Sequence, residues 1–485
     1  MLSLDRRSLL KFGLIGAAAA ALGAVPSIAS AAPEDTTSGQ PPLPSFMTGV
    51  YAPVADEISA VNLHVEGHIP AELSGRYFRN GPNPLPDTVP PIWWQGQGMV
   101  HGIRLTEGRA EWYRNRWVRT LEAPPTLPDG SPNLEVGAAN TSIKHHAGQI
   151  MALVETALPY QLTPDLDTVG PLDFGGKLQT AMTAHPKVDP STGEMHFFGY
   201  AVTPPYATYH RLSAEGELVR SVPIELPEAI MMHDFAITAN YIVWLDLPVV
   251  WNLAALERGF PNWSDTHQPR IGVMPQDGDS SDIRWYSVDP RYAWHVGNAY
   301  EDEVGRIVLQ AVSGTAADWA QTTKVFEGVP GGRVHGHLYQ WMLDPRSGRV
   351  SEGPLDDLAT EFPTINDSHC GLSNRYVYST TTPLLPTKHN RIVKHDSLTG
   401  FQQAHYLGAD IVPGEAVFVP AQHGRSEDDG WLMAIVHDLT RPAASLLILD
   451  ATAPTAPPVA TVHLPRQVPY GYHGEWIPDS AINPT

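Results

Sequence analysis

Four histidines stand in short hydrophobic or glycine-containing stretches between positions 185 and 473. They are His185, His233, His295 and His473. Neutral imidazole is a good ligand for first-row transition metals, so a set of four such residues predicts a metal site. Ligands that lie this far apart in the chain need one large closed scaffold to bring them together. The pattern therefore predicts a metalloenzyme.

The scaffold is predicted to be mostly β. The chain has 485 residues, 42% of them hydrophobic, and its 46 prolines and 41 glycines provide frequent turn signals. Tight hairpin turns are expected at 106–108, 189–193, 213–216, 344–348 and 396–400. Three of these share the pattern Asp-x-x-Ser/Thr-Gly, in which the carboxylate caps the turn and glycine takes the positive φ. Recurring hairpins without amphipathic helices favour stacked sandwiches or a propeller.

The N-terminus has the features of an export signal. Arg6 and Arg7 precede an apolar stretch at 12–25 and a small-residue site at 29–31, which is typical of a cleaved twin-arginine signal. An ordinary secretory signal remains an alternative. We expect residues 1–31 to be removed, 32–52 to form a flexible leader, and 53–485 to form a single domain of a periplasmic or extracellular protein.

Charge limits the range of partners. The formal net charge is −21, and removal of the predicted signal, which carries +2, leaves −23. Such an acidic surface repels nucleic acid and anionic lipid, so an apolar or uncharged small substrate is expected. The single Cys370 excludes an intramolecular disulfide. No later apolar run reaches the roughly 18 residues that a membrane span requires, although peripheral contact with a bilayer remains open.

From about Asn62 onward the sequence resembles the carotenoid cleavage oxygenases. The resemblance rests on nine short motifs in the order found in that family. They are GRYFRNGPNP at 75–84, GMVHG at 98–102, ETALP at 155–159, TAHP at 183–186, HDF at 233–235, HVGNAY at 295–300, EFP at 361–363, GEAVFVP at 414–420 and YHG at 472–474.

The resemblance implies a fold, a metal and a reaction. The implied fold is an all-β, seven-bladed propeller, with a cap of helices and loops over the face that carries iron. We expect cap segments at 87–97, 158–181, 248–263 and 315–332. The four histidines match the family's ligands for ferrous iron, Fe(2+). The implied reaction is oxidative cleavage of a C=C bond of a carotenoid or apocarotenoid by dioxygen, which gives two carbonyl products.

The resemblance also assigns supporting residues. Glu155, Glu361 and Glu415 lie in the motifs that carry the carboxylates expected to accept hydrogen bonds from the ligand imidazoles. Tryptophans in the cap segments are candidates for lining a substrate tunnel; they are Trp93, Trp94, Trp251 and Trp263. Histidines outside the motifs are expected to be structural; they are His145, His146, His369, His395 and His463.

Two departures from the family pattern limit what carries over. Gln95 and Gln97 replace two acids of a family motif, so hydrogen bonding near the tunnel entrance is expected to differ. Pro91 and Leu121 stand where the stilbene-cleaving branch has a tyrosine and a lysine that bind the substrate phenol. A phenol-activating mechanism is therefore less favoured than cleavage of a polyene.

Alternatives remain open. The same iron chemistry could act on a phenylpropanoid or stilbene alkene, and a metal-dependent propeller hydrolase of the lactonase type, or a non-catalytic binding platform, would share the fold. A site of two histidines and one carboxylate is a further option for iron. Asp234 follows His233 directly, so in a strand it would point to the opposite face, which argues against it as a ligand.

Overall fold

The computed structural model describes residues 43–334, 336–381 and 389–482. The predicted export signal and the first part of the predicted leader, 32–42, lie outside these residues. The rest of that leader contains two 3-10 helices, η1 (Ser45–Met47) and η2 (Gly49–Tyr51). Phe46 is buried in the core, and the backbone N–H of Ser45 donates to the carbonyl of Gly328 at 3.3 Å. Packed structure therefore begins before the predicted start at Pro53.

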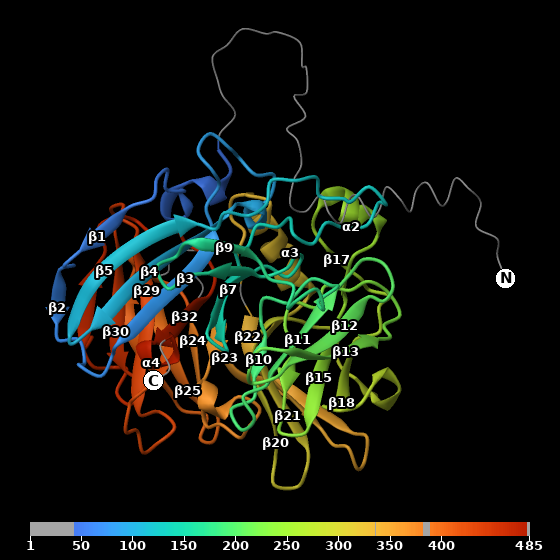
Figure 1. The fold of residues 1–485 in the computed structure, drawn as a ribbon. Coiled ribbons are helices and arrows are strands. Elements are labelled where there is room, and N and C mark those ends of the chain that lie inside the picture. The colour runs from blue at the N-terminus through green and yellow to red at the C-terminus, as the bar shows by residue number, and fades with distance from the viewer. Residues whose placement is uncertain (1–42, 335, 382–388, 483–485) are drawn as a thin grey trace.

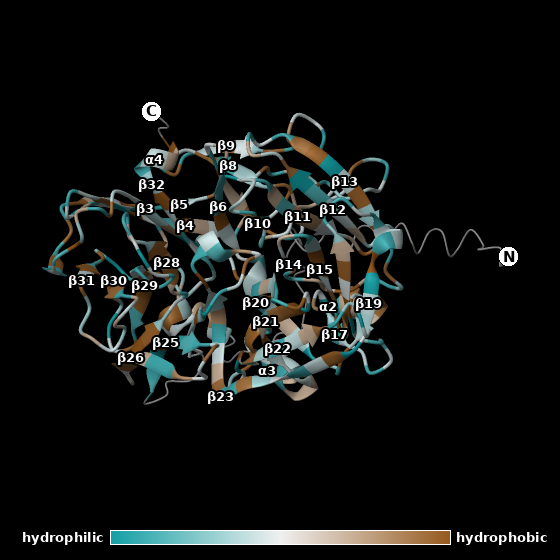
Figure 2. Ribbon diagram, turned by 90° about the horizontal axis from the view of Figure 1, so that it is seen from below, coloured by the Kyte–Doolittle hydropathy of each residue, from teal (hydrophilic) through white to brown (hydrophobic). Residues whose placement is uncertain are grey.

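Antiparallel sheets arranged in a ring form the body of the described structure (Figures 1 and 2). The first blade contains β32 (Gly474–Pro478), β3 (Gly75–Pro82), β4 (Gly98–Thr106), β5 (Arg109–Trp117) and β1 (Ser59–Val61). The second contains β6 (Ser142–His146), β7 (Gln149–Leu153), β8 (Tyr160–Leu162) and β9 (Thr168–Pro171). The third contains β10 (Lys187–Val188), β11 (Met195–Tyr200), β12 (Ala207–Leu212) and β13 (Leu218–Ile224).

The remaining blades follow in chain order. The fourth contains β14 (Ala236–Ile237), β15 (Tyr241–Asp246), β18 (Arg270–Pro275) and β19 (Arg284–Ser287). The fifth contains β20 (Tyr292–Glu301), β21 (Ile307–Gly314), β22 (Gly336–Leu343) and the first part of β23 (Val350–Thr364). The end of β23 starts the sixth, with β24 (Tyr376–Thr380), β25 (Asn390–Asp396) and β26 (Gln402–Gly408). The seventh contains β27 (Ile411–Pro413), β28 (Val417–Pro420), β29 (Gly430–Asp438), β30 (Ala444–Asp450), β31 (Ala460–His463) and β2 (Val65–Gly67).

The ring is closed twice by strands from opposite ends of the domain. β32 pairs antiparallel with β3 in the first blade, and Arg79 lies opposite Gly474. In the seventh blade β2 pairs antiparallel with β31, and Val65 lies opposite Val462. The fold is thus a seven-bladed β-propeller, as predicted.

The five predicted hairpin turns are confirmed. In each of them a glycine has a φ between 72° and 84°, in the left-handed region that glycine adopts without strain. The predicted carboxylate caps are also present. Asp189, for example, accepts a hydrogen bond from the backbone N–H of Ser191 at 2.7 Å, and Asp344 accepts one from Arg346 at 2.8 Å.

The few helices and a small two-stranded sheet supplement the blades. They are η3 (Trp93–Gln95), β16 (Val249–Val250), α2 (Leu253–Arg258), β17 (Asn262–Trp263), η4 (Ser280–Asp282), α3 (Ala316–Phe326), η5 (Asp367–His369) and α4 (Asp479–Ile482). Asn252 caps α2 by accepting from the N–H of Ala255 at 3.0 Å, and Gly259 ends it at a φ of 75°. Thr315 and Asp318 form a capping box at the start of α3.

Helices α2 and α3 lie together at the upper face in Figure 1, and α3 packs against η1 and η3. Three of the predicted cap segments, 87–97, 248–263 and 315–332, contain η3, α2 and α3 respectively. The fourth, 158–181, was predicted wrongly in part, because it holds β8 and β9 of the second blade. Strands of three and four residues are too short to show a clear alternation in the sequence. No helix among the described residues has the length and apolar character needed to cross a bilayer.

Candidate metal centre

Four blades each direct one histidine toward the propeller axis. His473 directly precedes β32, and His185 and His233 lie two and three residues before β10 and β14. Each of these strands stands at one end of the strand order of its blade. His295 lies within β20, at an irregularity in its pairing with β21. A propeller places such strands around one axis, so residues from distant parts of the chain come together there.

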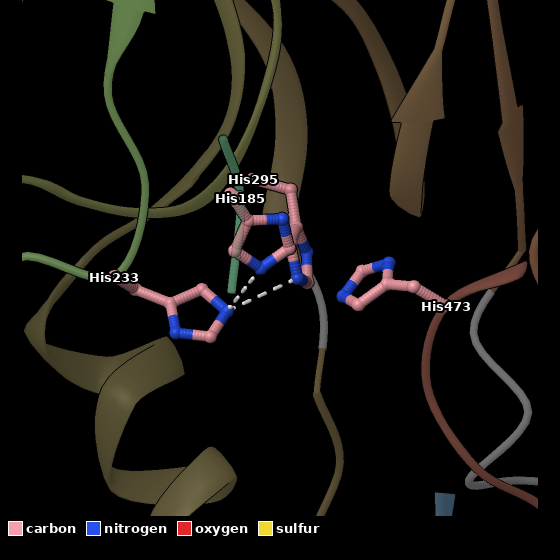
Figure 3. Close-up of side chains that lie close together, drawn as sticks. All are labelled: His185, His233, His295 and His473. Atoms are coloured by element: carbon pink, nitrogen blue, oxygen red, sulfur yellow. Dashed lines mark hydrogen bonds between the residues drawn. The ribbon is translucent and has the colours of Figure 1, made fainter. Parts of the chain in front are cut away.

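The ring nitrogens of these four histidines converge (Figure 3). Nε2 of His233 lies 3.0 Å from Nε2 of His185 and 3.3 Å from Nε2 of His295. With one ring nitrogen of His473 they form a set whose members all lie within 4.8 Å of one another. An ion about 2.1 Å from two nitrogens at a right angle would separate them by about 3.0 Å. The spacing fits a single metal ion.

Three carboxylates fix the orientation of three of the rings. Nδ1 of His233 donates to Oε2 of Glu155 at 2.7 Å. Nδ1 of His295 donates to Oε2 of Glu361 at 2.6 Å, and Nδ1 of His473 donates to Oε1 of Glu415 at 2.8 Å. His185 has no carboxylate partner of this kind among the described residues. Each of the three predicted glutamates therefore contacts a different histidine.

These hydrogen bonds determine which nitrogen carries the proton. With Nδ1–H donated to a carboxylate, a neutral imidazole presents a lone pair at Nε2. His233 and His295 then direct two lone pairs at each other across 3.3 Å, an arrangement that is unfavourable unless a cation lies between them. The donor set therefore fits a divalent metal that accepts nitrogen ligands.

Burial favours the neutral form of two of the rings. It holds the pKa of His185 well below its ordinary value, and the neighbouring histidines lower it further. Burial also lowers the pKa of His473, although Glu415 opposes that effect. At His295 burial acts in the same direction, but the charge and hydrogen bond of Glu361 outweigh it, so the pKa is raised. Neutral rings are the form that binds metal.

Asp234 points away from the ring nitrogens. Its Oδ1 lies 2.8 Å from Nζ of Lys187, and only 1% of its side chain is exposed. The same oxygen accepts a hydrogen bond from the backbone N–H of Phe235 at 2.7 Å. The carboxylate is thus neutralised and bonded to neighbouring groups, in agreement with the expectation that it faces away from His233.

An aromatic cavity lies on one side of the cluster. Its wall includes His233, His295 and His473, and the aromatic residues in it are Trp93, Trp94, Tyr200, Trp251, Trp294, Phe326, Phe362, Tyr470 and Tyr472. Three of the four predicted tunnel tryptophans therefore line it. Trp263 does not, which corrects the expectation. It lies in β17, and its Nε1 donates to Asp265 at 3.1 Å.

A polar cavity lies against the same cluster and shares His295 and His473 with the first. His185 and Cys370 also line it, and its charged residues are Lys144, Lys187, Asp234, Asp367, Glu415 and Glu475. Lys144 and Glu475 form an ion pair at 2.7 Å. Burial alone would lower the pKa of Lys144, but the charge of Glu475 outweighs it and the pKa is raised. The histidine cluster therefore borders one apolar and one charged space.

Sequence reasoning missed several residues at the site. The hydroxyl of Tyr200 donates to Oε1 of Glu155 at 3.0 Å, so it holds the oxygen that His233 leaves free. Trp294 packs with its ring at 79° to that of His233, at a centroid distance of 4.9 Å. Phe362 and Trp294 directly adjoin Glu361 and His295 in the sequence, and this proximity is the signal that points to them. No local signal marks Tyr200.

Phe362 has an unusual backbone conformation beside the cluster. Its φ is 52°, in the left-handed region that bulky residues seldom adopt. Its backbone N–H donates to Oε2 of Glu361 at 2.7 Å, and its ring stacks on that of His295 at 5.3 Å. Phe362 therefore contacts both the carboxylate of Glu361 and the imidazole of His295.

The residues that depart from the family pattern lie outside the cavity wall. The amide of Gln97 donates to the carbonyl of Val118 at 2.8 Å and to the hydroxyl of Thr120 at 3.2 Å, which an ionised acid could not do. Pro91 and Leu121 are both exposed and do not line the aromatic cavity. No pair of phenol-binding side chains stands at those two positions.

Known proteins are similar to this chain over most of its length. Residues 51–478 match the family model described as RPE65, retinal pigment epithelial membrane protein. A carotenoid cleavage oxygenase of Mycobacterium tuberculosis is 36% identical, covering 89% of this chain and 97% of its own. A carotenoid 9,10(9',10')-cleavage dioxygenase of Crocus sativus is 34% identical, covering 90% of both chains.

Solved structures are also similar. The crystal structure of Pseudomonas brassicacearum lignostilbene dioxygenase has a TM-score of 0.79 and 26% identity, covering 90% of this chain and 100% of its own. That of cobalt-substituted Synechocystis ACO has a TM-score of 0.76 and 26% identity, covering 88% and 97%. Because the family model spans residues 51–478 and the mycobacterial enzyme is 36% identical over 89% of the chain, this chain belongs to the carotenoid cleavage oxygenase family.

Proposed function

We propose that the protein is an iron(II)-dependent dioxygenase that cleaves a C=C bond of a carotenoid or apocarotenoid to two carbonyl products. The observation that carries this proposal is the convergence of four histidine nitrogens at the wall of an aromatic cavity. Family membership and the names of the similar proteins support the reaction type.

His185, His233, His295 and His473 would hold the iron through Nε2. When bound, iron(II) supplies the activation of dioxygen for its addition to the alkene. Four neutral donors leave the ion its full positive charge, and Glu155, Glu361 and Glu415 reduce the cost of burying that charge. Four of about six coordination positions are then filled, which leaves room for a small ligand.

The aromatic cavity supports an apolar substrate. Flat rings such as those of Trp93, Trp251 and Trp294 offer large contact areas to a conjugated chain without requiring hydrogen bonds from it. The cavity would therefore hold the alkene beside the cluster and exclude water from it. Orientation of the double bond next to the metal is the contribution of these side chains to the rate.

The central test combines metal analysis with oxygen labelling. The full chain, loaded anaerobically with ferrous iron, is supplied with ¹⁸O₂ and a panel of carotenoids, apocarotenoids and vinyl phenols. We expect one iron in the four-histidine centre and cleavage of a polyene, with ¹⁸O in both carbonyl products. Calcium or zinc in that centre, with hydrolysis of lactones and no use of oxygen, would contradict the proposal. Cleavage of vinyl phenols alone would instead assign the stilbene-type substrate.

A matched pair of variants ties the reaction to the centre. His233→Ala removes a nitrogen donor that lies 3.0 Å from His185, so iron and activity should be lost together. His423→Ala changes an exposed histidine and should retain both. Retention of iron and activity in His233→Ala would remove this residue from the site.

We further propose that residues 1–31 direct export of the protein through the twin-arginine pathway to the periplasm or the medium. The paired Arg6 and Arg7, the apolar stretch at 12–25 and the small residues at 29–31 support this. Replacement of both arginines by lysine should leave the protein in the cytoplasm in a fractionation experiment. Unchanged export of that variant would indicate the ordinary secretory route.

Peripheral contact with a bilayer is proposed for the cap. Large apolar side chains are exposed on three of its segments: Val89 is 52% exposed, Leu253 58% and Val329 43%. A bilayer could supply an apolar substrate through this face. Co-sedimentation with neutral lipid vesicles should weaken in Leu253→Asp and should not change in Leu398→Asp, a substitution in the 396–400 turn. Equal binding of the two variants would contradict this contact.

A further inference from the structure

A second group of potential metal ligands lies at the outer edge of the seventh blade. β2 pairs with β31 so that Val65 faces Val462, which places His64 directly opposite His463. The backbone N–H of His463 donates to the carbonyl of His64 at 3.0 Å. Glu66 lies two residues after His64, and side chains two apart in a strand share a face. Two imidazoles and one carboxylate therefore stand on one face of a two-stranded edge.

The three side chains are close enough to share an ion. Oε1 of Glu66 lies 3.1 Å from Nε2 of His463, and the two imidazole rings are 5.1 Å apart between centroids. One ligand atom from each residue lies within 4.8 Å of the other two. In a tetrahedral zinc site, nitrogens at about 2.05 Å from the metal are about 3.4 Å apart. His64 and Glu66 are exposed, so small rotations of their side chains would bring the ligand atoms to this spacing.

The environment of His463 leaves its Nε2 available to an ion. Its Nδ1 lies 3.4 Å from the hydroxyl oxygen of Ser445, which can accept a weak hydrogen bond when Nδ1 carries the proton. Its Nε2 is a buried atom without a hydrogen bond, although Glu66 is near. A ring held at Nδ1 presents its lone pair at Nε2, toward the carboxylate and His64.

We propose that His64, Glu66 and His463 bind a divalent transition-metal ion, with zinc as the best match, separate from the four-histidine centre. Two imidazole nitrogens and one carboxylate oxygen are ligands that zinc accepts in tetrahedral geometry, and water would fill the fourth position. Three protein ligands on exposed strands predict moderate affinity. This proposal does not depend on the oxygenase reaction.

The position of the group gives the ion a structural role. β2 has only three residues, and it is the strand by which the N-terminal part of the domain joins the seventh blade. An ion bound to His64 and Glu66 on one strand and to His463 on the other links the two strands through side chains. An ion that binds only the folded state raises the free energy of unfolding by RT ln(1 + c/Kd), where c is the concentration of free ion, so the effect grows with that concentration. Zinc would therefore hold the short edge strand in the ring.

The experiment uses the full chain with iron already in its four-histidine centre. Zinc is added over a range of concentrations, and bound zinc and retained iron are measured in the same samples after equilibrium dialysis. Thermal unfolding is followed in parallel. The variants are His64→Ala and His463→Ala, with His423→Ala as the control for an exposed histidine outside the group. Glu66→Gln tests the carboxylate without removing an imidazole.

We expect the wild-type protein and His423→Ala to bind one additional zinc without loss of iron, and to show a higher melting temperature with zinc. Both His64→Ala and His463→Ala should bind that zinc at least tenfold more weakly and lose the zinc-dependent shift, and Glu66→Gln should fall between. Retained iron shows that each variant is folded. Equal zinc binding in all variants, no additional zinc, or zinc bound only in exchange for iron would overturn the proposal.

Discussion

One carboxylate oxygen of Asp234, Oδ2, lies 2.8 Å from the backbone nitrogen of Val296 and accepts its hydrogen bond. Asp234 follows His233, and Val296 follows His295, so this bond between a side chain and the backbone joins the segments of two candidate ligands. The other oxygen of Asp234 pairs with Lys187, two residues after His185. A side chain that faces away from the ring nitrogens therefore links three of the four histidine segments.

Asp234→Asn should loosen this arrangement. An amide has one acceptor oxygen and no charge, so it can keep the bond to Val296 only by giving up the ion pair with Lys187. We expect iron affinity to fall about tenfold, the lower end of the range for groups that support metal ligands. Competition with a ferrous chelator would measure it. Asp129→Asn, in an exposed turn, is the control, and an unchanged affinity in Asp234→Asn would contradict this role.

Glu415→Gln should weaken the centre more strongly. Glu415 accepts from Nδ1 of His473 and, through its second oxygen, from the backbone N–H of Gly474 at 2.7 Å. An amide would place an N–H₂ group against one of these two donors, and the charge that makes His473 more basic would be lost. We expect iron affinity to fall about 10- to 100-fold.

The same chelator competition measures this effect, with Glu107→Gln as the exposed control. Restoration of activity by excess ferrous iron would show that the defect is in metal binding. A loss of activity at full iron occupancy would instead place Glu415 in the chemical step.

Buried neutral histidines away from the centre predict acid sensitivity. Burial lowers the pKa of His196 and His210 to about 4, and that of His437 to about 3. Below a pH of about 6.5 the unfolded chain binds protons at these residues while the folded chain does not, so the free energy of unfolding decreases as pH falls. The free energy of unfolding continues to decrease until the pH reaches the pKa of each histidine in the folded protein. At pH 5 each of these histidines lowers the free energy of unfolding by at most about 2 kcal/mol relative to neutral pH.

Urea unfolding at pH 7 and pH 5 checks this prediction. His210→Gln should be less stable at pH 7, because its hydrogen bonds to Thr180 and Ser221 are disturbed, and should lose less stability between the two pH values. His423→Gln should follow the wild-type protein. A His210→Gln variant with the full wild-type pH dependence would rule out His210 as a contributor.

The ion pair between Lys144 and Glu475 should be costly to break from one side. Their side chains are 25% and 17% exposed and face the polar cavity, so one charge without its partner would remain largely desolvated. We expect Glu475→Gln to lower the free energy of unfolding by about 3 kcal/mol. The double change with Lys144→Met should recover part of this loss. Denaturant unfolding of both variants at equal iron content measures the difference, and an equal loss in both would contradict it.

Local chemistry made the turns and the centre predictable from sequence. Asp189 and Asp344 cap their turns through contacts within a few residues, so the signal is complete in the local sequence. The candidate ligands were marked by the motifs around them. The pairing of β2 with β31 and of β3 with β32 joins segments hundreds of residues apart, and no local pattern encodes it.

The sequence does not reveal the roles of residues that depend on contacts between distant segments. Tyr200 contacts Glu155 because β11 and the end of β7 belong to neighbouring blades. Trp263 was expected in the tunnel because its segment belongs to the cap, but its position in β17 keeps it out of the cavity wall. The family resemblance implied a cap, but it did not specify which side of each cap segment faces the cavity.

The closure of the first blade by β32 affects the order in which the protein can mature. His473 is synthesised 178 positions after His295, so the ribosome makes three of the four nitrogen donors long before the last one. Until then β3 lacks its partner strand and exposes an unpaired edge, to which other nascent chains could attach. Translation itself thus sets the earliest moment for metal capture, and slow elongation over this last stretch would prolong the period in which the chain is open to aggregation.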